Sequence, residues 1–426
     1  MAQDDNTKRL EEAKQLSQEK PSQAEQLYQD ILSKPPGAND RAARDFEAAL
    51  MGLGELYRDH KRTQDLANLV QQTRDVLTSF ARAKTAKLVR QLLDLFTAIP
   101  NTLETQISVT KSCIEWAQSQ RQGFLRQNLE VRLVGQYMQK QAYYDALTLI
   151  NTLLKELKRL DDKLVLVEVQ LQESRVYHAL GNIPKGRAAL TSARTSAASV
   201  YCPPLLQAGL DMQSGQLHAE DADFQTAFSY FIEALEGYHS LALPSPAKPT
   251  AALQYMLLCK VMLSAPSADL DALLTSKHAL RYAGPRLDAM QAVARAHSAR
   301  SLEAYETALH TYRYELGSDP FIASHLRRLY DSMLEANLIK VIEPFSRVEI
   351  AHVAAMVGLD VAQVERKLGQ MILDRVVVGV LDQGEGVLVV YEEEAGDQGY
   401  KAALETIEKL GGVVEGLYAG QAGLLE

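Results

Sequence analysis

The feature that most constrains this chain is a turn-and-helix motif that recurs about every 40 residues. The sequences AYYDA, NIPKG and DFQTA end at Ala146, Gly186 and Ala227. Each begins a helix after a similar preceding segment. Counting back by 40 residues reaches Gln106 and then Leu66, where the match is weaker. Repeats of this length built from paired helices are typical of right-handed solenoids of tetratricopeptide or related type, whose stacked hairpins form the core.

Amphipathic patterns fill the sequence between these turns. One apolar stripe recurs at helical spacing and is formed by Leu147, Ile150, Leu153, Leu154 and Leu157. Turn signals such as PPGAND before Arg41 and the proline-rich LALPSPAKPT at 241–250 separate the stripes. We therefore predict a mostly α fold that begins with a solenoid of tetratricopeptide-like helical hairpins over residues 1–240.

Two short helices are predicted after the repeats. SRVE at 346–349 has the form of a capping box and predicts a helix that runs through Met356, with Gly358 placed to end it. Asp360 and Gln363 form a second box before the helix VAQVERKLGQMIL.

After these helices the spacing of apolar residues changes from the period of a helix to the alternation of a strand, which repeats every two residues. RVVVGVL at 375–381, the turn DQGEG and the run VLVVYEE predict a β-hairpin. Helix, turn, helix and hairpin together form a winged helix, at about 346–391. Both faces of the hairpin are apolar, so one face or the open edge is available to pair with a neighbouring protein, unless the hairpin is wholly buried in its own domain. The candidate contact residues are Val376, Val378, Val387 and Val389.

A final helix over 395–426 carries an apolar stripe with no evident partner in the sequence. The candidate contact residues are Tyr400, Leu404, Ile407, Leu410, Val414 and Leu417. Gly411, Gly412 and Gly416 interrupt this helix, and each costs about 0.5–1 kcal/mol relative to alanine. We expect the helix to be unstable alone and ordered only when it packs among other helices.

Charge is distributed unevenly over a chain whose net charge is −9. Residues 41–140 contain 15 Lys and Arg against 10 Asp and Glu, whereas residues 375–426 contain 3 against 10. The basic segment at 41–140 could bind an acidic partner, although helix faces that only contact solvent can have the same excess of Lys and Arg. The candidate docking residues are Arg58, Lys61, Arg62, Lys84, Lys87 and Arg90.

Motifs for catalysis or cofactor binding are missing. The sequence has no HExxH, HxH, Walker A, GxGxxG or GxSxG pattern. Cys113, Cys202 and Cys259 form no CxxC pair, and the dispersed histidines have no partner at metal-ligand spacing. We expect no enzyme activity, no cofactor and no metal. The polar N-terminal stretch and the lack of a long apolar run indicate an intracellular, reducing compartment and no membrane span.

Winged helices often bind DNA, so nucleic-acid binding is an alternative. The helix that would enter the groove offers only Arg366 and Lys367, and the wing carries Asp382 and Glu385. Because these carboxylates repel phosphate, we expect no nucleic-acid binding.

Helical repeats that run into a winged helix resemble the PCI domain shared by scaffold subunits of the proteasome lid, the signalosome and translation initiation factor three. Within that group, five segments are similar to the family of 26S proteasome lid subunits of the non-ATPase regulatory subunit 11 type. They are YHALGNIPKGRAALTSARTSA (177–197), SRVEIAHVA (346–354), KLGQMILD (367–374), GVLDQGEGVL (379–388) and ALETIEKL (403–410).

The resemblance implies a PCI domain over about 250–394 and a scaffold role in ubiquitin-dependent degradation, in the cytoplasm and nucleus. Its implied partners are sister PCI subunits of the lid, the proteasomal ATPase ring and the α-ring of the core particle. The chain would be part of a hetero-oligomer. It would join lid subunits through its PCI module and its C-terminal helix, and would bridge the lid to the ATPase ring and the core particle through its N-terminal solenoid. A scaffold subunit of the signalosome is the alternative.

Overall fold

The computed structural model describes residues 10–16, 20–33, 40–77, 82–241, 246–391 and 398–422. The chain divides into two compact units, Met1–Ala265 with Ala272–Tyr282, and Pro266–Asp271 with Ala283–Glu426. The predicted domain limits of 1–240, 250–394 and 395–426 stay predictions, because compact units and functional domains need not share a boundary.

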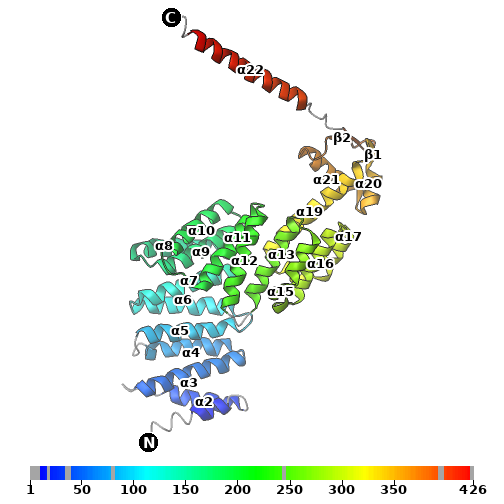
Figure 1. Ribbon diagram of the computed structural model, residues 1–426. Coiled ribbons are helices and arrows are strands. Elements are labelled where there is room, and N and C mark those ends of the chain that lie inside the picture. The colour runs from blue at the N-terminus through cyan, green and yellow to red at the C-terminus, as the bar shows by residue number, and fades with distance from the viewer. Residues whose placement is uncertain are drawn as a thin grey trace. The chain divides into compact units, whose positions relative to one another are not determined.

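The first unit consists of antiparallel helices that stack in sequence order (Figure 1). They are α2 (Pro21–Leu32), α3 (Asp40–Asp59), α4 (Thr63–Leu77), α5 (Arg82–Thr97), α6 (Leu103–Ser119), α7 (Gly123–Gln139), α8 (Tyr143–Leu160), α9 (Lys163–Ala179), α10 (Ile183–Ala198), α11 (Pro204–Glu220), α12 (Phe224–Ser240), α13 (Ala247–Met262) and α15 (Lys277–Arg281). Helix α14 (Ser267–Leu274) contributes residues to both units.

The repeat predicted from the sequence is confirmed, including its two weak matches. Ala146, Gly186 and Ala227 are each the fourth residue of their helix, namely α8, α10 and α12. Gln106 in α6 and Leu66 in α4 occupy the same position. All five are buried, because this position faces the preceding helix. At Gly186 a Cβ atom would lie 3.4 Å from the carbonyl oxygen of Ser174, so a small residue allows the two helices to approach closely.

The turns before these helices repeat as well. Lys61, Asn101, Gln141, Gly181 and Ala222 each have a positive φ, from 57° to 75°, and each lies two residues before a helix. A left-handed residue of this kind ends one helix and redirects the chain into its antiparallel partner. Only one of the five is glycine, so four turns carry the steric cost of a side chain in the left-handed region.

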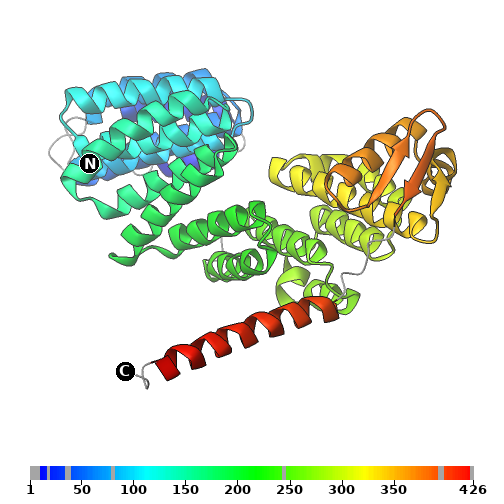
Figure 2. The same ribbon diagram turned by 90° about the horizontal axis from the view of Figure 1, so that it is seen from above.

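The second unit contains helices followed by a small sheet, seen from above in Figure 2. Its elements are α16 (Pro285–Ser298), α17 (Leu302–Thr311), α18 (Arg313–Gly317), α19 (Pro320–Ile342), β1 (Arg347–Glu349), α20 (Ile350–Val357), α21 (Val361–Leu373), β2 (Gly379–Asp382), β3 (Val387–Val390) and α22 (Gln398–Ala422). The three strands are antiparallel in the order β1-β3-β2, and with α20 and α21 they form the predicted winged helix.

The capping box predicted at 346–349 is wrong. Residues Arg347–Glu349 form strand β1, in which Arg347 pairs with Val389, and helix α20 begins only at Ile350. Strand β3 forms backbone hydrogen bonds with this segment, which a local sequence pattern cannot show. This pairing outweighs the tendency of SRVE to start a helix. The end of α20 is as predicted, because Gly358 adopts the left-handed conformation with φ of 75°.

Asp360 does stand directly before α21, as predicted, but its side chain makes no capping hydrogen bond, so the second capping box is also wrong. The hairpin is shorter than predicted. Val376 N and Val377 N donate to the carbonyl oxygen of Met371 and close the end of α21, so β2 begins at Gly379.

Candidate interaction surfaces

The winged-helix sheet exposes apolar side chains along its β2 side. Val376, Val378 and Val380 are 50%, 41% and 52% exposed, and Tyr391 beside them is 54% exposed. Val389 is half-buried. Val387 is buried, at 8% exposure, so it offers the least surface of the four candidate contact residues, which stay candidates.

The outer edge of β2 is open among the residues that the structure describes, since β3 lies on its other side. Tyr391 N donates to Val378 O at 2.8 Å, and Val380 pairs with Val389. In an antiparallel ladder the bonding side alternates, so the backbone groups of Gly379 and Leu381 point to the open edge. An apolar edge with unpaired backbone groups is a surface for strand addition.

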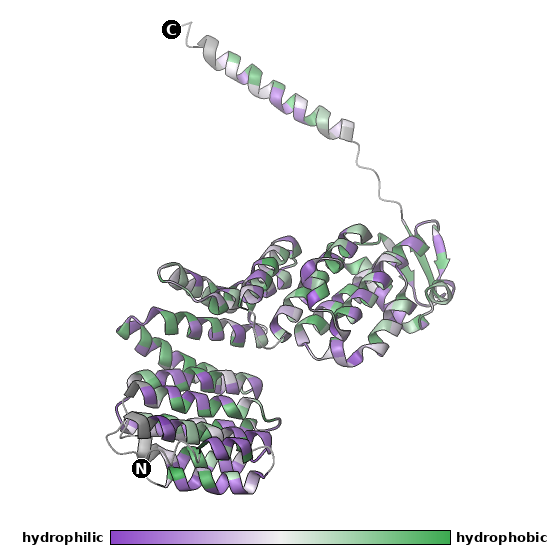
Figure 3. Ribbon diagram, turned by 60° about the horizontal axis from the view of Figure 1, so that its bottom comes forward, coloured by the Kyte–Doolittle hydropathy of each residue, from purple (hydrophilic) through white to green (hydrophobic). Residues whose placement is uncertain are grey.

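Helix α22 presents its apolar stripe to solvent. Its described side chains from Gly399 onward are all exposed, and Figure 3 shows apolar and polar positions mixed along it. The exposed stripe contains every residue predicted for it: Tyr400, Leu404, Ile407, Leu410, Val414 and Leu417. The helix continues through its glycines, and Cβ atoms at Gly411, Gly412 and Gly416 would meet nothing within 4 Å. Exposed apolar stripes of this extent mark interaction sites.

The six basic docking candidates fall into two groups. Lys84, Lys87 and Arg90 lie one helical turn apart on the exposed face of α5. In the other group, at the turn from α3 to α4, Arg58 pairs with Asp59 at 2.9 Å and Arg62 with Glu25 at 3.2 Å. Lys61 occupies the left-handed turn position between them. Two of the three charges in the second group are thus partly neutralised, whereas the three on α5 share one exposed face.

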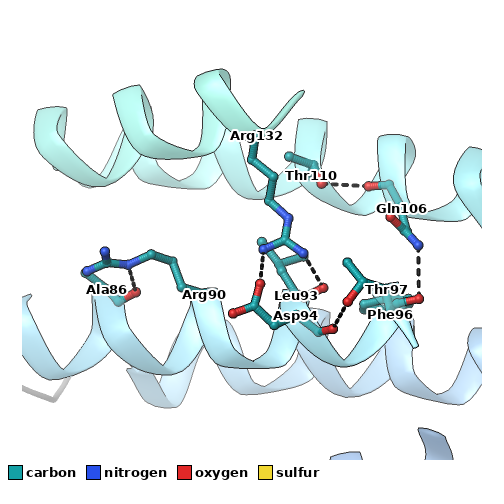
Figure 4. A network of polar contacts seen from close by, with 9 residues as sticks. All are labelled: Ala86, Arg90, Leu93, Asp94, Phe96, Thr97, Gln106, Thr110 and Arg132. Carbon is teal, nitrogen blue, oxygen red and sulfur yellow. Dashed lines mark hydrogen bonds and ion pairs between the residues drawn. The ribbon is translucent and has the colours of Figure 1, made fainter. Parts of the chain in front are cut away.

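A polar network that sequence reasoning missed lies beside that face (Figure 4). Arg132 on α7 reaches α5, where it pairs with Asp94 and donates to the carbonyl oxygen of Leu93 at 2.6 Å. Gln106 on α6 donates to Phe96 O at 3.0 Å. These bonds hold three helices in register and so fix the orientation of the basic face on α5. Arg90 uses its Nε to bond Ala86 O, within its own helix.

The missed network has a signal in the sequence. Opposite charges recur slightly less than one repeat apart, in the pairs Glu25–Arg62, Asp94–Arg132 and Glu104–Lys140. This separation brings two side chains together on successive hairpins.

The features expected of other functions are not found in the described residues. No group of three or more potential metal ligands occurs among them. Lys367, a candidate for phosphate contact, is instead paired with Glu335 at 2.8 Å and with Asp331 at 3.9 Å on α19. Of the helices in the described ranges, none combines the length and the hydropathy that crossing a membrane requires.

Helical repeats that continue into a winged helix define a PCI-domain protein, and the PCI domain model matches residues 309–392. Models of the 26S proteasome regulatory subunit RPN6 N-terminal domain and of the RPN6 C-terminal helix domain match residues 6–140 and 397–419.

Full-length relatives agree with these matches. The chain is 52% identical over 399 residues to the probable 26S proteasome regulatory subunit rpn6 of Schizosaccharomyces pombe, covering 94% of both chains. It is 45% identical to the 26S proteasome non-ATPase regulatory subunit 11 homolog of Arabidopsis thaliana, again covering 94% of both. It is 43% identical to the 26S proteasome regulatory subunit RPN6 of Saccharomyces cerevisiae, covering 96% of this chain and 97% of that one. The chain therefore belongs to the Rpn6 family, that of non-ATPase regulatory subunit 11 of the 26S proteasome.

Proposed function

We propose that this chain is a non-catalytic scaffold subunit of the proteasome lid, acting in ubiquitin-dependent degradation in the cytoplasm and nucleus. Its winged helix would join sister PCI subunits, and α22 would enter a helical bundle with them. The α5 basic face would bind an acidic surface of the ATPase ring or of the core particle α-ring.

The observation that carries this proposal is that the apolar surfaces on the β2 edge and on α22 are both uncovered by the described chain. A soluble chain exposes such surfaces at a cost unless a partner covers them. The membership in the Rpn6 family favours lid subunits as those partners over the subunits of a signalosome. Nothing in the described residues suggests a catalytic centre, and the paired Lys367 argues against phosphate contact by the winged helix.

The test is a charge on the open edge. Val378→Asp places a carboxylate among the exposed apolar side chains, so it should block incorporation into a lid reconstituted from co-expressed subunits. Because Val378 is already 41% exposed, the free subunit should keep its thermal unfolding midpoint. Tyr314→Asp is the matched control, since Tyr314 is 84% exposed on α18 and lies outside the proposed surfaces.

Incorporation of Val378→Asp at the control level would show that the β2 edge is not a lid contact. Purification of the tagged chain with signalosome subunits, rather than with lid and ATPase subunits, would select the alternative assembly. Peptidase, isopeptidase or ATPase turnover by the purified chain would overturn the non-catalytic role.

A further inference from the structure

A groove with a volume of about 500 Å³ lies between α17, α18 and α19 of the second unit. Its lining is mainly apolar and includes Leu309, Leu316, Ala323 and Leu326. Leu316 and Leu326 are buried, whereas Leu309 and Ala323 are half-buried and leave apolar surface open to solvent. Ligand pockets in proteins usually measure about 300–1,000 Å³, so the groove is large enough to take side chains of a partner.

Hydrogen bonds between α17 and α19 fix the walls of this groove. The fully buried Tyr305 on α17 donates from its hydroxyl to the carbonyl oxygen of Leu326 on α19 at 2.7 Å. In the opposite direction, the Tyr330 hydroxyl on α19 donates to Glu306 Oε1 on α17 at 3.0 Å. Burial and this hydrogen bond raise the pKa of Tyr330 to about 12, so the hydroxyl keeps its proton at neutral pH. A groove whose walls are already fixed costs little ordering when a ligand binds.

The polar part of the lining is mostly basic. His310 on α17, Arg313 on α18 and Arg327 on α19 are all exposed beside the apolar surface. Neither arginine side chain forms a hydrogen bond or an ion pair with any residue in the described ranges. Glu306 is the one acidic residue among the described lining residues, and one of its carboxylate oxygens already accepts a hydrogen bond from Tyr330. The groove therefore offers two guanidinium groups with free donors next to an apolar surface.

The arginines of the groove differ from a paired arginine in the same unit. Arg347 on β1 has a side chain that is 64% exposed, yet it pairs with Glu385 at 2.6 Å. Asp331, one helical turn after Arg327, lies 3.9 Å from Lys367 Nζ. An exposed arginine of this unit can thus be paired within the chain, whereas the two at the groove are available to a carboxylate from outside it.

We propose that the groove binds a short acidic peptide segment of a protein partner, with leucine-type side chains in the groove and flanking carboxylates on Arg313 and Arg327. Apolar side chains of the peptide would leave water when they contact the leucines of the lining. A planar guanidinium can bind both oxygens of a carboxylate at once, which favours arginines as contacts for acidic ligands. The residues of the groove do not belong to the β2 edge, to α22 or to α5, so this site goes beyond the assembly surfaces proposed above.

The probe is the fluorescein-labelled hexapeptide EELLEE, titrated with the full chain and followed by fluorescence anisotropy. Two control peptides carry the same label, and all three have an amidated C-terminus. QQLLQQ keeps the leucines but has no carboxylates, and EESSEE keeps the carboxylates but has no leucines. EELLEE should bind about tenfold more tightly than either control, because it alone matches both the arginines and the apolar lining.

Reversing the charge of the groove tests the two arginines. Arg313→Glu combined with Arg327→Glu should weaken EELLEE binding by about tenfold or more, because two attractions become repulsions. Arg295→Glu combined with Arg366→Glu is the matched control, since both arginines are exposed in the same unit, outside the groove, and the net charge changes equally. The control should change binding by less than about twofold.

Ala323→Trp tests the apolar part of the groove. The indole should occupy the space meant for the leucines and weaken EELLEE binding by about tenfold, with no change of charge. Since Ala323 is half-buried, the thermal unfolding midpoint of this variant is measured as well. The arginine variant changes exposed side chains alone, so it tests the site even where Ala323→Trp lowers the midpoint.

The proposal is overturned if EELLEE does not bind, or if QQLLQQ or EESSEE binds equally well. It is also overturned by an arginine variant that weakens binding no more than its control does. Displacement of labelled EELLEE by oligothymidylate at a lower concentration than by unlabelled EELLEE would assign the groove to nucleic acid instead. These measurements use the free chain, so their outcome is independent of the scaffold role in the lid.

Discussion

Helix α12 of the solenoid and helix α22 at the C-terminus carry the same kind of apolar stripe but have opposite surroundings. In α12 the stripe is buried by its neighbours, with Phe231 fully buried and Tyr238 nearly so. In α22 every described side chain of the stripe is exposed. The comparison teaches that an amphipathic pattern predicts a helix and a buried face, but not whether the covering partner belongs to the same chain.

The largest expected effect is on assembly. Removing residues 395–426 deletes a helix whose stripe has no cover in the described chain, so the subunit should stay folded and soluble but fail to enter the lid. Size-exclusion chromatography of co-expressed subunits measures incorporation, and thermal unfolding of the free subunit measures the fold.

Hydrogen exchange sharpens the same point. The backbone amides after Gly411 should exchange fast in the free subunit and become strongly protected in the lid, because helical stability comes mostly from packing. Strong protection in the free subunit would mean that α22 folds back on its own chain, and the contrast with α12 would disappear.

The second effect concerns stability. Phe231→Ala should cost about 3–5 kcal/mol in the free energy of unfolding, because it opens a cavity in a packed core. A Cβ atom on Gly215 would lie 2.5 Å from Phe231 Cε1, so the ring packs directly against the glycine backbone. Ile407→Ala on α22 is the control and should change the free energy of unfolding by no more than about 0.5 kcal/mol. Chemical denaturation measures both variants, and equal losses would show that α22 is part of the chain's own core.

A third, smaller effect compares two basic faces. Reversing Lys84, Lys87 and Arg90 to glutamate should weaken docking of the lid on the ATPase ring and core particle by about tenfold, since exposed charges contribute about 0.2–1 kcal/mol each. The control is the same reversal of Lys155, Lys158 and Arg159, which are exposed on α8. The loss should be greater at low salt, because salt screens exposed charges. Docking that is independent of salt would contradict the proposed role of α5.

The smallest effect tests the repeated turns. Ala222 has φ of 64°, so Ala222→Gly should stabilise the free chain by about 1 kcal/mol, because glycine has no Cβ to clash in that region. Gly181→Ala, at φ of 75°, should destabilise it by a similar amount. Thermal unfolding of both variants provides the measurement, and shifts of the same sign would contradict this explanation of the turns.

The sequence predicted the parts of this molecule that local patterns control. The weak matches at Leu66 and Gln106 proved to be genuine repeat positions, because helical periodicity and turn geometry operate within about 40 residues. The end of α20 at Gly358 was predicted for the same reason, since a left-handed glycine acts on its own helix alone.

Predictions from local patterns were wrong where a segment distant in the sequence supplied the hydrogen-bonding partner. SRVE became strand β1 because β3, some 40 residues later, offered a hydrogen-bonded edge. The burial of Val387 could not be predicted either, because alternation alone does not say which residues of a hairpin pack on their own domain.

By itself, the sequence determined the helical repeat, the winged-helix order and the stripe on α22, since each depends on residue spacing along a single element. Only the tertiary structure decided which stripes are covered, which strand edge is open and which arginines bond to another helix. Arg90 and Arg132 are both helical arginines in a repeat, and no local feature separates them. Arg90 donates to Ala86 O within its own helix, whereas Arg132 contacts Asp94 and Leu93 O on α5, and these groups meet only when the hairpins stack.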